Sequence, residues 1–139
     1  MTGFKITTNV GTEIRFKYYP EAPVTAKAFN DTLPFALTIM HAKVSGQELW
    51  SDKAPGLDII QENASVFAAP GEFVIAPMKP ERNKVKNCLG IFYGEGKLVD
   101  CCNFFAKVYE EDFELLKEFG EKIWREGFQD VQFEKIDQL

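Results

Sequence analysis

The residues of this chain that could do chemistry gather in one short segment. His41 is the only histidine in the sequence, and Ser45, Glu48 and Trp50 follow it closely. An imidazole titrates near neutral pH, so it can bind a ligand or transfer a proton. A carboxylate can orient that imidazole or bind a cationic or amide group, and an indole offers an apolar face with one donor. The segment therefore predicts a ligand-binding cleft, with His41 and Glu48 as candidate catalytic residues.

Three residues from other parts of the chain could belong to such a cleft, with Asn63 lining it and Tyr93 and Asn103 near its rim. Asn63 lies in a loop segment, Tyr93 ends an expected strand, and Asn103 begins the next one. Local turn hydrogen bonds are the usual role of asparagine, and histidine, glutamate and tryptophan also occur as ordinary sheet or core residues. The hypothesis for the binding site comprises His41, Ser45, Glu48, Trp50, Asn63, Tyr93 and Asn103.

Several common kinds of site are not indicated. A single histidine without HxH or CxxC motifs argues against a protein-built transition-metal site. No acid is placed behind His41 to form a serine triad, and no strand–glycine–helix context marks a phosphate loop. Cys101 and Cys102 are adjacent, so in a strand they point to opposite faces and neither bridge nor share a metal. We expect reduced, buried thiols, no metal and no cofactor.

Charge and hydropathy restrict the partners. The formal net charge is −5, from 16 Lys and Arg against 21 Asp and Glu, and nucleic-acid binding normally needs a clustered basic face. No apolar run approaches the ~18 residues of a membrane helix. The N-terminal residues also lack the apolar core of a signal peptide. The sequence therefore predicts a cytoplasmic protein that binds neither nucleic acid nor membranes.

Hydrophobic periodicity predicts the elements that position these side chains. Period-two alternation and turn residues mark the strands, and apolar spacing with charged ends marks the helices. The expected strands cover residues 4–8, 14–18, 35–50 (two strands separated near Ser45 and Gly46), 57–60, 72–76, 88–93, 103–109 and 131–133. A glycine-marked turn at residues 94–96 is expected between the sixth and seventh of these segments. The expected helices run from Pro23 to about Thr32, with Val24, Ala28 and Phe29 buried, and from Glu110 to a cap at Gly127.

These elements predict a mainly β protein with two helices, in a single domain over residues 1–139. Aromatic residues suit pleated, half-buried surfaces, and the chain contains 13 Phe. No linker or low-complexity tract divides it. Many short strands with two helices are typical of a small closed barrel capped by helices.

Three segments resemble a known family. They are residues 24–50, residues 62–77 (ENASVFAAPGEFVIAP) and residues 103–133, and their most specific pieces are HAKVSGQELW, ENASVFAAPGE and WREGFQDVQF. Together they are similar to the prokaryotic cyclophilin-like proteins of unknown function catalogued as DUF3830. This resemblance implies an eight-stranded closed barrel of the cyclophilin type, with helices covering its ends.

The comparison with true cyclophilins also implies a difference in activity. Their active strand reads Phe-His-Arg, whereas the matching tripeptide here is Met40-His41-Ala42. Trp50 falls about where a cyclophilin glutamine lies. Without the arginine, the twisting amide loses its main electrostatic support, so efficient prolyl isomerase activity is not expected.

Three hypotheses for function remain open at this point. The first is binding of a small molecule or short peptide in a cleft around His41. The second is an enzyme that acts on a small amide, lactam or related metabolite, with His41 as acid or base and Glu48 orienting it. The third is weak prolyl isomerase activity or a structural homo-oligomer formed by Phe-rich strand edges, such as residues 102–109.

Overall fold

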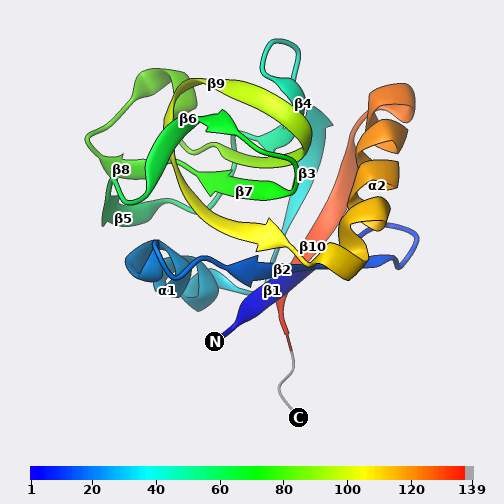
Figure 1. The fold of residues 1–139 in the computed structure, drawn as a ribbon, viewed down its shortest axis with the longest axis horizontal. Coiled ribbons are helices and arrows are strands. Elements are labelled where there is room, and N and C mark those ends of the chain that lie inside the picture. The colour runs from blue at the N-terminus through cyan, green and yellow to red at the C-terminus, as the bar shows by residue number, and fades with distance from the viewer. Residues whose placement is uncertain (137–139) are drawn as a thin grey trace.

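The computed structural model describes residues 1–136 and shows a mainly β protein with two α-helices (Figure 1). The strands are β1 (Gly3–Thr7), β2 (Glu13–Tyr18), β3 (Phe35–His41), β4 (Gly46–Ser51), β5 (Leu57–Ile60), β6 (Ala64–Ala68), β7 (Glu72–Ile75), β8 (Pro77–Lys79), β9 (Leu89–Val108) and β10 (Gln129–Lys135). The helices are α1 (Pro23–Thr32) and α2 (Phe113–Glu126), with short 3-10 helices at Asn83–Val85 and Glu110–Asp112.

Eight strands form one sheet whose pairings return to their starting point. The order is β2-β1-β10-β3-β4-β9-β6, and β7 also pairs with β9. Because β2 pairs with the far end of β9, the sheet forms a ring of antiparallel pairs. The remaining strands, β5 and β8, make a separate parallel pair. The expected hairpin, the two strands on either side of Ser45 and the last strand are confirmed.

The clearest difference between the sequence prediction and the structure is strand β9. Two strands joined by a turn at residues 94–96 were expected, but β9 is one continuous strand of 20 residues. It bends so that Phe73 of β7 is paired with both Ile91 and Ala106. The glycines allow close packing rather than a turn: a Cβ on Gly96 would lie 2.3 Å from the Ser45 carbonyl oxygen.

The segment over residues 51–71 contains one more strand than the sequence predicted. Strand β5 is confirmed there, but β6 was not predicted, and it pairs with residues 96–103 in the middle of β9. Its alternation is unusual because Phe67 is 70% exposed. A strand is recognised in a sequence when its apolar residues alternate on one buried face. Because the largest apolar residue of β6 points to solvent, the sequence of this strand lacks that pattern.

Helix α1 has the expected bounds, whereas α2 begins at Phe113 because residues 110–112 form a 3-10 helix instead of its first turn. The buried face of α1 also differs from the prediction. Val24 is exposed, whereas Thr25 and Phe29 are fully buried. The reason is the carboxylate of Glu62, which accepts hydrogen bonds from the backbone N–H and hydroxyl of Thr25 and turns this residue inward. In α2 the buried side chains of Leu116, Phe119 and Ile123 form one apolar stripe, and Gly127 ends the helix with φ at 97°.

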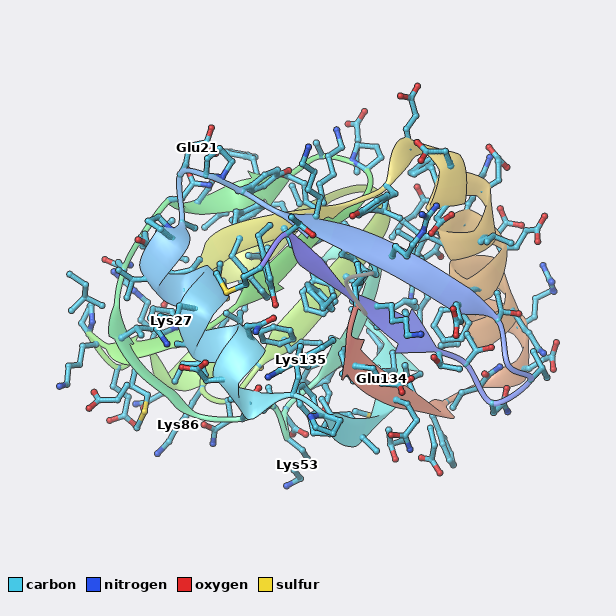
Figure 2. The ribbon with its side chains drawn as sticks, turned by 90° about the horizontal axis from the view of Figure 1, so that it is seen from below. Glu21, Lys27, Lys53, Lys86, Glu134 and Lys135 are labelled. Carbon is cyan, nitrogen blue, oxygen red and sulfur yellow. The ribbon has the colours of Figure 1, made fainter. Side chains whose placement is uncertain are left out.

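The side chains form two buried clusters on opposite faces of β7 and β9. The larger cluster holds the stacked and edge-on rings of Phe4, Phe16, Phe73 and Phe105. Figure 2 views the end of the molecule where α1 lies, with Glu21 just before this helix and Lys27 on it. The smaller cluster includes Val74, Phe92, Leu98, Cys102 and Phe104. None of the helices within residues 1–136 has both the length and the hydropathy to cross a membrane.

Candidate functional site

A cavity of about 340 Å³ borders the smaller cluster. Its deep end contains residues that are almost fully buried, including Glu48, Val74 and Cys102. Trp50 and Cys88 form further walls. Exposed side chains surround the mouth, namely Lys43, Val44, Lys84 and Val99. The cavity is thus mostly apolar, with one buried acid inside and two lysines at its opening.

The register of the β3–β4 hairpin decides which side chains enter this cavity. Met40 lies opposite Trp50, and His41 lies opposite Leu49. Successive residues of a strand point to opposite faces, so Glu48 and Trp50 share the cavity face while Leu49 enters the larger cluster. The turn needs Gly46, which has φ at 96° and whose added Cβ would lie 2.7 Å from the Glu95 carbonyl oxygen.

Glu48 is the most unusual ionisable group of the cavity. Only 6% of the residue is exposed. The hydroxyl of Ser45 donates to its Oε1 at 2.5 Å, and no side chain or backbone group of residues 1–136 donates to Oε2. A Cβ on Gly90 would lie 2.0 Å from Oε2, so glycine leaves the room that the carboxyl group occupies. Burial raises the pKa of Glu48 to about 7, and the Ser45 hydrogen bond only partly offsets this.

His41 borders the cavity, but its imidazole is used elsewhere. Nδ1 lies 2.7 Å from the carbonyl oxygen of Ala42, and Nε2 lies 2.7 Å from the hydroxyl of Tyr93. A carbonyl can only accept, so Nδ1 donates to Ala42, and Nε2 shares its hydrogen bond with the Tyr93 hydroxyl. The ring also packs edge-on against Trp124 of α2, with centroids 4.8 Å apart. Glu48 therefore does not orient His41: the two side chains belong to opposite faces of the sheet.

Asn63 and Asn103 lie away from the cavity and hold the backbone together. Asn103 is fully buried; its Nδ2 donates to the Thr25 hydroxyl and to the carbonyl of Ile60, and its Oδ1 accepts from the backbone N–H of Glu62. Asn63 adopts a left-handed conformation and donates to the carbonyl of Phe104. These contacts join α1, β5 and β9, which is the structural role that asparagine often has.

Two cavity thiols were not assigned to the site from the sequence. Burial raises the pKa of Cys88 to about 11, with smaller contributions from Asp52 and Glu48, and it raises the pKa of Cys102 further. Both thiols are free and stay protonated at neutral pH, so they act as polarisable walls rather than nucleophiles. Their position depends on the bend of β9, which no local sequence pattern indicates.

The lysines at the mouth were also missed. Within residues 1–136, no carboxylate lies within ion-pair distance of Lys43 or Lys84. Apart from Glu48, they are the only charged side chains among the described residues that line the cavity. The opening is therefore locally positive in a chain whose net charge is −5.

Comparisons with known proteins agree with this architecture. The sequence model of one family, described as "Protein of unknown function (DUF3830)", matches residues 8–135. McbB, solved in complex with tryptophan, is 17% identical with a TM-score of 0.69 over 98% of this chain and 45% of its own. The hypothetical protein AF2241 from Archaeoglobus fulgidus is 16% identical with a TM-score of 0.62, covering 97% and 95%. The chain thus spans less than half of McbB but nearly all of AF2241. Among curated protein sequences, none matches.

Proposed function

Since the chain belongs to the DUF3830 family of proteins of unknown function, we propose from its own site that it binds a small organic anion with an apolar or aromatic body. The observation that carries this proposal is the apolar cavity of about 340 Å³ with two unpaired lysines at its mouth. Ligand cavities commonly combine apolar walls with a few polar groups, and this volume suits a compact molecule better than a peptide.

Each part of the ligand has a matching part of the cavity. The ring of Trp50 and the side chains of Val74 and Leu98 suit an apolar body. The ammonium groups of Lys43 and Lys84 attract an anionic group at the opening. Below its pKa of about 7, Glu48 is protonated and can donate to an acceptor on the ligand. Above that pH its charge opposes an anion.

The same cavity supports the absence of efficient prolyl isomerase activity. Ala42 stands where the cyclophilin arginine would be, and no arginine is among the described residues that line the cavity. The alternative with His41 as acid or base has less support, because both ring nitrogens are already bonded. The proposal therefore moves the centre of the site from His41 to Glu48.

We also propose that the ring of paired strands is a closed, cyclophilin-type barrel and that the protein works in the cytoplasm of a prokaryote. The antiparallel ring and the two buried clusters support the first point. The resemblance in residues 24–50, 62–77 and 103–133 supports the second.

Fluorescence of Trp50 offers a direct test. The chain has only two tryptophans, so Trp124→Phe leaves Trp50 as the sole reporter of the cavity. Phenylacetate, phenylacetamide and phenethylamine share one body and differ in charge. At pH 6 we expect the anion to bind most tightly and the amine most weakly. Tryptophan, the compound bound to McbB, is a further probe, measured by calorimetry.

Matched variants identify the groups responsible. Replacing both mouth lysines (Lys43→Gln with Lys84→Gln) should weaken phenylacetate binding at least tenfold, whereas Lys53→Gln, outside the cavity lining, should not change it. Native mass spectrometry of gently purified protein would reveal a retained molecule. Equal affinity for anion and amine, or an unchanged affinity in the double variant, would contradict the proposal.

A further inference from the structure

We propose that Glu48 is a catalytic acid and base that moves a proton at carbon, interconverting the keto and enol forms of a small 2-oxo acid with an apolar body. This inference rests on the proposed function, because the substrate must first bind in the cavity as an anion. It adds a reaction to binding, and it assigns the reaction to Glu48 rather than to His41.

The geometry gives Glu48 one fixed oxygen and one available oxygen. The Ser45 hydroxyl holds Oε1, and Oε2 has no hydrogen-bond donor among residues 1–136. Both Ser45 and Glu48 are more than nine-tenths buried, and Glu48 lies on a strand paired on both sides, with β3 and β9. A carboxyl group that lines an apolar cavity on a rigid strand, and that keeps one oxygen without a donor, is well placed for proton transfer.

The other side chains of the cavity do not support covalent catalysis, so proton transfer by Glu48 is the chemistry that remains. Cys88 and Cys102 are protonated thiols, so a covalent thiolate route is not supported. A carboxyl group with its pKa near 7 is populated in both forms at neutral pH, so it can take a proton and give it back. The groups that face Glu48 from neighbouring elements are Ser45, Cys88 and Cys102, with Lys43 and Lys84 at the mouth.

The step balances without any further reactant. Ionised Oε2 removes a proton from the carbon next to the ketone, and the electron pair of that C–H bond becomes the C=C bond. The C=O electron pair moves onto oxygen, which gives an enolate, and the substrate carboxylate stays near the lysines. Glu48 then returns the proton to the enolate oxygen, giving the enol, or to carbon, giving the ketone back. Nothing is oxidised or reduced.

A 2-oxo acid is the substrate class that fits all three parts of the cavity. Its carboxylate suits the two ammonium groups, and its apolar body suits Trp50. The ketone makes the neighbouring C–H acidic enough for a carboxylate base when the enolate is stabilised by positive charge. Phenylpyruvate combines these features and can serve as the probe.

The experiment follows exchange of the benzylic hydrogens of phenylpyruvate in deuterated buffer by proton NMR. We expect the wild-type protein to raise the exchange rate at least tenfold above buffer alone. Glu48→Gln should return it to the buffer rate while phenylpyruvate still binds by calorimetry, because the amide keeps the shape and the Ser45 hydrogen bond. Glu95→Gln, an exposed acid outside this cavity, should match wild type.

Two different failures can be told apart. Phenylpyruvate that binds to wild-type protein but exchanges at the buffer rate would overturn the catalytic role and leave the binding function intact. Phenylpyruvate that does not bind would overturn both. Accelerated exchange that persists in Glu48→Gln would show that another group is the base and would also overturn the inference.

Discussion

Burial of the Glu48 carboxyl group is unfavourable for folding, but it places an acid with a raised pKa in the cavity. Burial of this carboxyl group among apolar walls raises its pKa from 4.5 to about 7, although the hydrogen bond from Ser45 opposes part of this rise. A core residue selected for stability alone would be apolar, since an ionised group is costly to bury. The glycine at position 90 strengthens this interpretation, because it leaves the space that the carboxyl group needs.

The raised pKa predicts a specific pH dependence of stability. Between pH 4.5 and about 7 the folded protein binds more protons at Glu48 than the unfolded chain does, so this contribution to stability is complete below pH 4.5 and is lost as pH rises through 7. The difference corresponds to about 3 kcal/mol. Glu48→Gln should therefore gain stability over wild type from pH 5 to pH 8, measured by urea unfolding. Parallel pH profiles for the two proteins would contradict this, and Glu95→Gln is the control.

Asn103 provides the opposite case, a polar side chain with a structural role. Its amide makes three hydrogen bonds in a fully buried position, so Asn103→Ala should destabilise the protein by about 2–4 kcal/mol. Binding of phenylacetate to the remaining folded protein should stay within twofold of wild type. Urea unfolding and calorimetry check these outcomes. A large loss of affinity with unchanged stability would instead return Asn103 to the binding site.

Among the secondary-structure elements, β9 decides the shape of the cavity, and Gly90 tests this. Gly90→Ala would place a Cβ 2.0 Å from Glu48 Oε2 and 3.1 Å from Val74. We expect Glu48 to be displaced, with at least a tenfold loss of phenylacetate affinity and a destabilisation of about 1–3 kcal/mol. Gly56→Ala, whose Cβ would make only an ordinary contact with Met78, is the matched control. Unchanged affinity in Gly90→Ala would show that this packing is not required.

The elements that sequence patterns predicted are those whose signals are local. The first hairpin, α1, α2 and the last strand follow from periodicity and caps within a few residues of each element. Strand β9 was split because glycine usually marks a turn, whereas here Gly94 and Gly96 admit the neighbouring strand and side chains. In a sequence, a glycine that allows close packing between distant segments looks the same as a glycine in a turn.

Only those parts of the candidate site that depend on local sequence could be predicted. Glu48 and Trp50 are two residues apart on one strand, so their common face follows from strand geometry alone. His41 was grouped with them by nearness in sequence, but its face depends on the register between β3 and β4. A shift of one residue in that register reverses the face, and local sequence does not fix it.

In the molecule as a whole, β9 contributes side chains to both buried clusters, and most of its length is paired with other strands. Residues 102–109 were expected to form an exposed, Phe-rich edge for assembly. Instead β9 pairs with β2, β6 and β7, and Phe104 and Phe105 are buried in different clusters. Homo-oligomer formation therefore stays a prediction without this basis. Among the exposed apolar residues, the large side chains of Trp124 and Phe128 lie in and just after α2.

Because the same strands carry both clusters, we predict that the molecule unfolds as one cooperative unit. Trp50 reports the cavity face and Trp124 reports the α2 face, so Trp124→Phe and Trp50→Phe isolate the two sides. Within each variant, the urea midpoint from fluorescence should equal the midpoint from far-ultraviolet circular dichroism. Comparing two probes in one protein removes the effect of the substitution itself. If the fluorescence midpoint falls below the circular dichroism midpoint in Trp124→Phe but not in Trp50→Phe, the cavity side unfolds first. The smaller cluster would then be a separate cooperative unit, although it shares strands with the larger one.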